Sequence, residues 1–316
     1  MINKIFFYSV KSRRFYFATQ LLFIIVLLPI VVACSSGSGT PANNGNTPTG
    51  SSAAVELCIS ENKSFVDTNI AGADIIDGGL AYDKWWVANR GTEPTADHLL
   101  WSTQTTNTRT GSVTWRCKEC HGWDYQGKDG AYGPTNSHFT NFIGVSGARE
   151  KNPADVFCTI KSLENHAFGD VMTDSNILDL TAFIVDFGGQ SEGIIDYNVV
   201  LNSDDLSTGD GSVGGPGDQN YNDVDGCGST DCHGIDGTQN AGNEFSIGDV
   251  ALDNPWEFLH KIRYGQPGAN MPSGISDSNL EFQPQMADIL AYAQTQLPQQ
   301  NPGGGSTIEG DYIRGG

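Results

Sequence analysis

Basic residues are scarce in this chain of 316 residues, in which 17 Lys and Arg stand against 37 Asp and Glu and the formal net charge is −20. Because binding to a phosphate backbone needs clustered cations, this composition disfavours a nucleic-acid-binding protein. Long apolar runs are scarce as well, and a chain whose one such run is residues 21–32 is not a multispanning membrane protein. The 39 glycines and the hydrophobic fraction of 38% predict a soluble chain with many turns and modest cores.

The first 33 residues have the features of a secretory signal peptide. They contain four cations and no acidic residue, and their apolar run is too short for a comfortable membrane span. The run ends in Val-Val-Ala-Cys at residues 31–34, which resembles the lipobox of bacterial lipoproteins. In those proteins the cysteine becomes the lipidated first residue of the mature chain. We therefore expect residues 1–33 to be removed and Cys34 to carry lipid; an ordinary signal peptide with a chance cysteine is the alternative.

A flexible linker is predicted at residues 34–55, because Ser, Gly, Thr, Asn and Pro dominate it without apolar periodicity. A lipid anchor followed by such a linker predicts a folded module held at a membrane on the exported side. Each buried CH₂ of an acyl chain contributes ~0.8 kcal/mol, so a multiply acylated cysteine anchors a protein stably without a spanning helix. Ser35 follows the lipidated position, and the lipoprotein resemblance then implies the outer membrane, on its periplasmic or its surface side.

The strongest motif among the seven cysteines and six histidines is Cys117-Lys-Glu-Cys120-His121. This C-x-x-C-H pattern is typical of covalent attachment of c-type haem. Two thiols at this spacing can add to both vinyl groups of one porphyrin, and the adjacent imidazole is placed to bind the iron from the proximal side. A dithiol redox pair and half of a zinc site are the alternatives. Both are disfavoured, because a dithiol enzyme needs no adjacent His and a zinc site wants a second Cys or His pair nearby.

A second candidate attachment site has four residues between its thiols, since Cys227, Cys232 and His233 form C-x₄-C-H. Such longer sites resemble those of some multihaem cytochromes, and the alternative is a small disulfide loop. The residues downstream favour haem. An apolar helical pattern at 258–262 ends at Gly265, a Pro/Gly loop then presents Met271 before a proline, and further helical residues follow.

This order of motif, helix, Met-Pro loop and terminal helix resembles a class I cytochrome c domain, in which the loop methionine is the distal ligand of the haem iron. The resemblance therefore implies Met271 opposite His233 on the second haem. The same order occurs earlier, with helical patterns at 78–86, 155–160 and 177–184 around the first motif. In the first of these, a Gly and an aromatic residue four positions apart would let that helix cross the last one closely.

The resemblance covers roughly residues 70–300 and implies an all-α chain with two tandem class I cytochrome c-like domains. The expected division is a first domain at 56–187, a connector at 188–212, a second domain at 213–300 and a disordered tail at 301–316. Two features depart from the family. Residues 87–116 form an insertion of unknown purpose, and residues 214–226 make a poor helix where the first helix of the second domain is expected.

The distal ligand of the first haem is harder to place, because no Met-Pro pair lies between the last two helical patterns. His166 is favoured, since Met172 lies so close to the last helix that little loop is left to reach across a porphyrin. Met172 also has a structural role, because Thr173 is a credible N-cap. Met172 and Ile177 then occupy the positions of a hydrophobic staple.

Two cysteines and three histidines remain. Cys58 and Cys158 would lie in the oxidising exported compartment, so a disulfide between them is the economical pairing. The alternative is that Cys158 ligates an iron as thiolate, as in cytochromes that resemble thiosulfate dehydrogenases. His98 and His138 are weaker candidates for the distal position, and His260 is expected to face solvent.

These expectations together predict an exported, membrane-anchored cytochrome that carries two covalently attached c-type haems and transfers single electrons as iron cycles between Fe(II) and Fe(III). The acidic composition favours redox partners with basic docking surfaces. No substrate pocket or acid–base pair can be picked out. One alternative is a dihaem enzyme resembling thiosulfate dehydrogenases or peroxidases, in which the insertion shapes a pocket. Another is a fixed subunit of a respiratory or extracellular electron-transfer complex.

Overall fold

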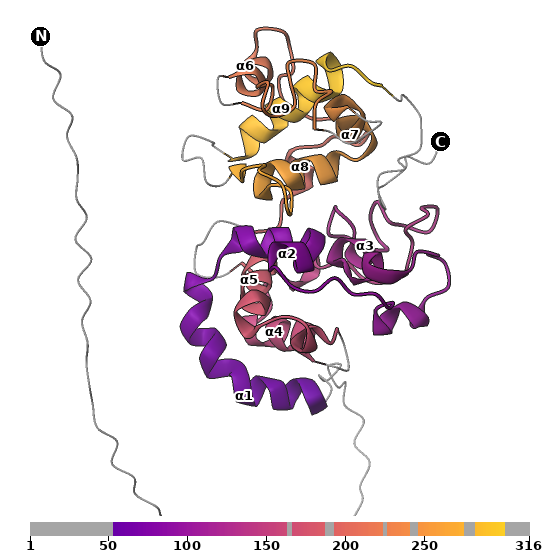
Figure 1. Ribbon diagram of the computed structural model, residues 1–316, viewed down its shortest axis with the longest axis vertical. Helices are drawn as coiled ribbons and strands as arrows, with labels where there is room; N and C mark the ends of the chain where they lie inside the picture. Colours follow the sequence, from indigo (N-terminus) through magenta and orange to yellow (C-terminus); the bar gives the residue numbers. More distant parts are fainter. Residues whose placement is uncertain are drawn as a thin grey trace, which may run out of the picture. The chain divides into compact units, whose positions relative to one another are not determined.

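The structure is a computed structural model that describes residues 53–162, 166–186, 193–223, 226–240, 246–274 and 282–300 (Figure 1). Every regular element of these residues is a helix, and their β-structure is limited to two isolated bridges. The chain is therefore all-α, as predicted. No helix in these ranges is long and apolar enough to cross a membrane. The predicted signal peptide, the lipidated Cys34 and the tail at 301–316 lie outside the described residues.

Side chains at the helix starts explain where the helices of the first half begin. The α-helices are α1 (Ala53–Asn69), α2 (Ile75–Ala88), α3 (Cys117–His121), α4 (Pro153–Lys161) and α5 (Asp174–Ile184). The 3₁₀-helices are η1 (Ile70–Gly72), η2 (Leu99–Thr103), η3 (Gly111–Trp115), η4 (Ser146–Ala148), η5 (Phe168–Asp170) and η6 (Tyr197–Val199). Asp74 caps α2 and Asn152 caps α4 through their side-chain oxygens. Thr173 accepts a hydrogen bond from the backbone of Asn176, so its predicted N-cap role is confirmed.

Helix α1 corrects the predicted end of the linker. The expected linker runs to residue 55, whereas α1 begins at Ala53 and Val55 is only 4% exposed. The helix packs against α4 and buries Val55 and Val66. Burial of these side chains holds the start of α1 in helical form, although the small polar residues before it predict a flexible chain.

The second half contains α6 (Pro216–Asn222), α7 (Ile247–Asp253), α8 (Pro255–Tyr264) and α9 (Phe282–Gln296). The interpretation of 214–226 as a poor helix is corrected by α6, which starts with a proline at a first-turn position and packs against α9. Tertiary packing therefore outweighs its weak intrinsic propensity. Helix α7 carries a capping box between Ser246 and Asp249, which the sequence signals although the helix was not predicted.

Helices α2 and α5 cross in very close contact. A Cβ added to Gly78 would lie 2.2 Å from the carbonyl oxygen of Asp179 and 2.7 Å from the Cβ of Phe183. One turn along α2, the Tyr82 ring packs on Phe183 with 5.3 Å between ring centres. The backbone N–H of Asp74 donates to the Asp179 carboxylate at 2.9 Å. The close crossing predicted from the Gly and aromatic spacing is confirmed.

The second half repeats this crossing between α6 and α9. A Cβ added to Gly217 would lie 2.2 Å from the carbonyl oxygen of Asp288. Four residues after Gly217, the Tyr221 ring packs on Tyr292 with 5.4 Å between ring centres. The backbone N–H of Asp210 donates to the Asp288 carboxylate at 2.7 Å. Both halves therefore place a Gly, an aromatic residue and an Asp at equivalent points of one helix crossing.

We expect Gly78→Ala and Gly217→Ala each to lower the free energy of unfolding by about 2–3 kcal/mol, because the added methyl group meets backbone atoms that cannot move away freely. Urea denaturation followed by circular dichroism measures the change. Gly147→Ala is the matched control, since a Cβ at Gly147 meets nothing within 4 Å. Equal destabilisation by the control and the two crossing variants would contradict the close crossings.

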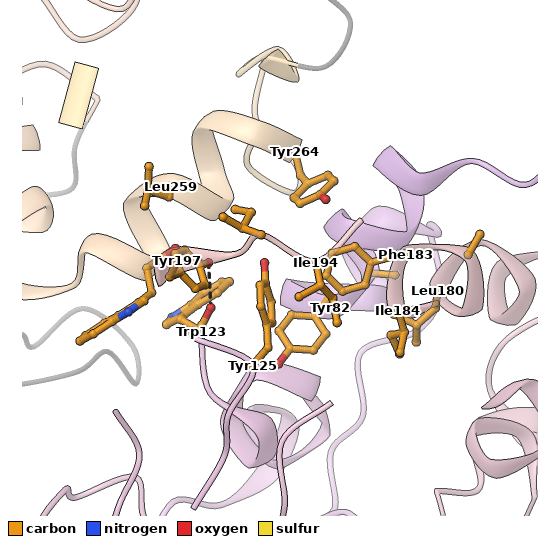
Figure 2. Packing of buried hydrophobic residues seen from close by; sticks show 14 of the residues in the cluster. Tyr82, Trp123, Tyr125, Leu180, Phe183, Ile184, Ile194, Tyr197, Leu259 and Tyr264 are labelled. Atoms are coloured by element: carbon orange, nitrogen blue, oxygen red, sulfur yellow. Dashed lines mark hydrogen bonds between the residues drawn. The ribbon is translucent and has the colours of Figure 1, made fainter. Parts of the chain in front are cut away.

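An aromatic cluster joins the two halves within the compact unit formed by residues 49–316 (Figure 2). Tyr197 comes from the segment between the halves, and its hydroxyl lies between two backbone carbonyl acceptors, that of Trp123 at 2.9 Å and that of Trp256 at 3.1 Å, which share its one hydrogen. Its ring stacks on Tyr125 with 5.5 Å between ring centres. The apolar part of the predicted connector is therefore buried between the halves.

The expectation that His260 faces solvent is wrong. His260 is 1% exposed, and its ring bridges α8 to the first half. Nε2 donates to the carbonyl of Gly79 at 3.0 Å, and the Tyr125 hydroxyl donates to Nδ1 at 2.7 Å. Burial lowers the pKa of His260 to about 4, so the ring is neutral with one donor and one acceptor nitrogen. Helix α8 is buried on two sides. Its hydrophobic periodicity identifies only the side that faces the core of the second half.

Candidate functional site

A cavity in the first half brings together the residues of the first motif. Cys117, Cys120 and His121 line it from α3, and His166 lines it from the loop after α4. The remaining walls are largely aromatic and include Trp115, Phe142 and Phe168. Mostly apolar walls with a few polar groups are typical of cofactor sites.

His121 and His166 face each other across this cavity. Their ring centres are 6.0 Å apart and the ring planes differ by 36°. A metal–imidazole bond of about 2 Å puts each ring centre about 3 Å from the metal, so two imidazoles on opposite sides of one ion have centres about 6 Å apart. The observed separation therefore fits two axial ligands of one haem iron, and it brings together the pair that the sequence analysis placed on the first haem.

Backbone carbonyls orient both rings. Nδ1 of His121 donates to the carbonyl of Ile143 at 2.6 Å, and Nδ1 of His166 donates to the carbonyl of Thr159 at 3.0 Å. Each Nε2 is thereby left as the acceptor nitrogen, which is the usual state of a metal-ligating His whose other N–H is held by a backbone carbonyl. Burial, and then the neighbouring His121, lower the pKa of His166 to about 4. Burial also lowers the pKa of His121, so both rings are neutral.

The two thiols of the motif sit on α3, a single turn that ends at Gly122 with φ of +76°. Cys117 and Cys120 are half-buried and not disulfide-bonded. Burial raises the pKa of the Cys117 thiol to about 12 and also raises that of Cys120. Thiols in this state are poor nucleophiles, which argues against a dithiol redox pair.

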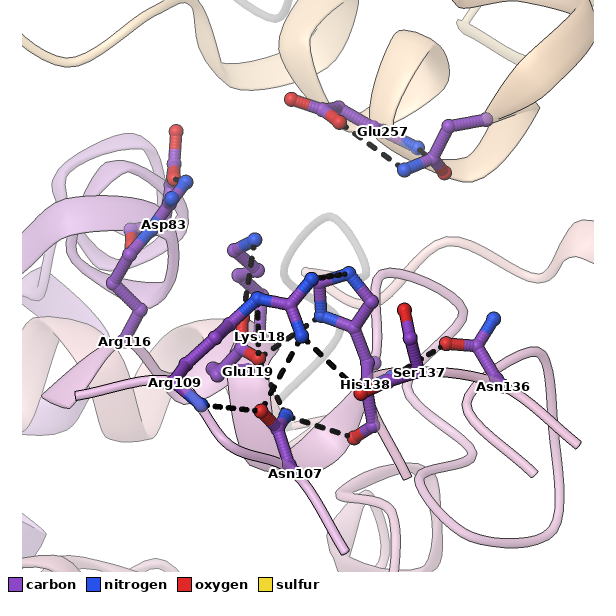
Figure 3. Close-up of polar contacts among 12 residues, drawn as sticks. Asp83, Asn107, Arg109, Arg116, Lys118, Glu119, Asn136, Ser137, His138 and Glu257 are labelled. Atoms are coloured by element: carbon purple, nitrogen blue, oxygen red, sulfur yellow. Dashed lines mark hydrogen bonds and ion pairs between the residues drawn. The ribbon is translucent and has the colours of Figure 1, made fainter. Parts of the chain in front are cut away.

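A buried polar cluster lies behind α3 (Figure 3). Glu119 is fully buried and accepts hydrogen bonds from Nδ1 of His138 at 2.9 Å and from the side-chain amide of Asn107 at 2.7 Å. Arg109 donates to Nε2 of His138 at 2.7 Å. Burial opposes ionisation of Glu119, but Lys118 and then His138 hold its pKa down at about 2. This cluster was not predicted from the sequence, although the two charged residues inside C-x-x-C, Lys118 and Glu119, are a signal for it.

The other candidates for the distal position of the first site are accounted for. Met172 is 7% exposed and belongs to the hydrophobic core, which agrees with its predicted staple role. His138 belongs to the polar cluster behind α3. His98 lines the cavity, but its Nε2 donates to the carbonyl of His166 at 2.8 Å and its Nδ1 accepts from the backbone of Leu100 at 3.2 Å. His166 differs from these residues in that its ring centre lies 6.0 Å from that of His121 while its Nδ1 donates to Thr159, which leaves Nε2 as an acceptor.

The second candidate site is described only in part, because 241–245 and 275–281 lie outside the described residues. Cys227 and Cys232 are not disulfide-bonded, so the alternative of a small disulfide loop is not observed. Nδ1 of His233 donates to the carbonyl of Gln239 at 3.0 Å, as His121 does to Ile143. The Tyr221 hydroxyl donates to the carbonyl of Gly234 at 3.0 Å.

Equivalent hydrogen bonds support the attachment turn at both motifs. The Tyr82 hydroxyl donates to the carbonyl of Gly122, directly after His121, at 2.7 Å, in the same way as Tyr221 does at the second motif. Met271 is half-buried in the loop after α8. In the described part of the chain the structure records no contact between Met271 and His233, so their pairing stays a prediction.

Cys58 and Cys158, which the sequence analysis paired, form a disulfide between α1 and α4 with their Cα atoms 5.7 Å apart. The alternative of Cys158 as a thiolate ligand is therefore wrong for this structure, because its sulfur is already bonded. The described residues contain no group of three or more His, Cys, Asp or Glu that could hold a metal ion. An iron held by a porphyrin takes only its axial ligands from the protein.

Comparisons with known protein families, with curated proteins and with solved structures find no match to this chain.

Proposed function

We propose that this protein is an exported dihaem c-type cytochrome lipoprotein that transfers single electrons between redox partners. The observation that supports it best is the facing pair of His121 and His166, whose ring centres are 6.0 Å apart beside the thiols of Cys117 and Cys120. Export and lipid anchoring at the outer membrane rest on residues 1–34 of the sequence. The second haem rests on the Cys227, Cys232 and His233 motif.

A c-type haem supplies an iron that gains and loses one electron at a potential set by its axial ligands and surroundings. The residues of the chain have three tasks toward it. Cys117 and Cys120 would hold it by thioether bonds, and His121 and His166 would ligate it in their neutral form. The backbone carbonyls of Ile143 and Thr159 orient those rings.

The charge distribution supports a basic redox partner. Residues 193–300 include sixteen acidic and two basic residues, Lys261 and Arg263. Lys261 is paired with Glu257, and Arg263 is 4% exposed. Among the described carboxylates of this half only Asp249 and Glu257 are buried, so most of the others reach solvent with few cations among them, and the resulting field steers a positively charged partner toward this half.

An enzyme is the second candidate, because residues of the 87–116 insertion line the cavity, as a substrate pocket would require. The positions of His121 and His166 favour the carrier, since a catalytic haem needs an exchangeable sixth ligand. The optical spectrum separates the two functions. Two low-spin, six-coordinate haems would support a carrier, and a high-spin component that binds added ligands would support an enzyme.

We expect the intact mature protein purified from membranes to carry two covalent haems and an acylated Cys34, as its mass and the haem content of the denatured chain will show. Cys232→Ala should remove one thioether bond of the second haem and leave the first site fully attached. The matched variant Cys158→Ala should keep both haems. A mature mass with one haem, or a disulfide between Cys227 and Cys232, would rule out the second site.

A further inference from the structure

We propose that residues 91–115 form a strap that holds the loop carrying His166, here called the distal loop, against α3. We propose further that His98 is the residue of this strap that positions His166. The inference rests on the proposed function, because it assigns His166 as an iron ligand. It gives a role to most of the insertion, which the class I resemblance leaves unexplained.

The ring of His98 does two different tasks with its two nitrogens. Nδ1 accepts from the backbone N–H of Leu100 at 3.2 Å and so caps η2 inside the strap. Nε2 donates to the backbone carbonyl of His166 at 2.8 Å. The second bond ties the strap to the residue whose imidazole faces His121. Because His166 also donates from its own Nδ1 to Thr159, both its backbone and its ring are held.

The strap holds His98 firmly. The backbone N–H of His98 donates to the Thr114 hydroxyl at 2.8 Å, and the indole of Trp115 donates to the carbonyl of Ala96 at 2.8 Å. The imidazole lies edge-on to Trp115, with 4.5 Å between ring centres, and 5.7 Å from the ring of Phe168 in the distal loop. At 6% exposure His98 is a buried part of the cavity wall.

The same strap also contacts α3, which carries His121 on the other side of the cavity. Asn107 donates to Glu119 at 2.7 Å and to the carbonyl of His138 at 3.2 Å, and Arg109 lies 3.5 Å from the Glu119 carboxylate. Glu119 is fully buried on α3 between the two motif cysteines. One continuous segment thus contacts α3 at one end and the carbonyl of His166 at the other. This arrangement sets the gap between the two facing imidazoles and keeps other molecules from replacing His166.

His98→Asn is the sharpest test, because Asn keeps the capping oxygen for Leu100 but is too short to reach the carbonyl of His166. We expect the fraction of first haems open to carbon monoxide in the reduced protein to rise about fivefold, which is the effect of one lost hydrogen bond. The electron paramagnetic resonance signal of the oxidised bis-imidazole haem should weaken in parallel. His98→Gln, which restores a donor at longer reach, should recover most of the wild-type behaviour.

Trp101→Phe is the matched control, since it removes one hydrogen bond of the strap, to the carbonyl of Arg109, without touching His166. Should His98→Asn fold poorly, Thr114→Val tests the same idea by releasing the backbone of His98. If the His98 and Thr114 variants keep the carbon monoxide binding and the resonance signal of the wild type, the strap proposal is overturned and the assignment of His166 as a ligand still stands. A wild-type protein without a bis-imidazole signal would overturn the ligand assignment and, with it, the role of His98.

Discussion

Replacement of Cys58 and Cys158 by serine is expected to lower the free energy of unfolding by about 4–5 kcal/mol. The two cysteines are 100 residues apart in the sequence, and a cross-link that closes a loop of this length removes a large conformational entropy from the unfolded chain. In the folded protein the bond joins α1 to α4. Denaturation by urea, with haem absorbance and circular dichroism as separate probes, measures the change.

Two controls separate the covalent bond from the helix packing around it. Asn62→Ala removes the hydrogen bond that Lys161 of α4 donates to the Asn62 side chain at 3.1 Å, and the one that Asn62 donates within α1 to the carbonyl of Cys58 at 2.9 Å. The substitution should cost only about 1 kcal/mol. Wild-type protein treated with a thiol reductant should become as unstable as the double serine variant. If neither the variant nor the reductant changes the urea midpoint, the disulfide is absent and Cys158 is again available as a ligand.

His166→Met is expected to raise the reduction potential of the first haem by on the order of 0.1 V, within the span of about 0.8 V that axial ligands cover. The soft thioether stabilises ferrous iron better than a second imidazole does. Loss of the N–H donated to Thr159 acts in the same direction, because that bond makes the imidazole a stronger electron donor to the iron. Spectroelectrochemical titration of the purified protein gives both potentials.

The wild-type titration also tests the order of the two haems. If His166 ligates the first iron and Met271 the second, the first haem has the lower potential, and electrons pass downhill from the first half to the second. Met271→His should then lower the potential of the second haem and leave the first unchanged. Met172→Leu is the control for His166→Met, because Met172 belongs to the core and should leave both potentials in place. If His166→Met leaves the reduction potential of the first haem unchanged, His166 is not its distal ligand and Met172 becomes the favoured candidate.

The sequence by itself determined the features that depend on residues close together in the chain. Thr173 caps α5 because its hydroxyl needs to reach only three residues ahead, and Gly265 ends α8 because a residue without Cβ adopts φ of +87° easily. The spacing of Cys117, Cys120 and His121 on one turn is likewise local. The same holds for the Gly and aromatic spacing of α2, because positions four apart share one face of a helix.

Only the tertiary structure decided which distant residues meet. His166 follows His121 after η4 and α4, yet their ring centres lie 6.0 Å apart because the loop after α4 lines the same cavity as α3. His98 reaches the carbonyl of His166 across 68 positions, and no local pattern in a Thr-rich insertion predicts such a bond.

His260 and α6 show the physical reason most clearly. The periodicity of α8 identifies the side that packs on its own core, but His260 lies on another side, and the first half that buries it has no signal within the helix itself. Helix α6 has weak propensity and forms because Gly217 and Tyr221 fit against α9. Capping, turns and motif spacing act within a few residues and can be predicted from the sequence, whereas burial against a second element depends on the complete packed chain.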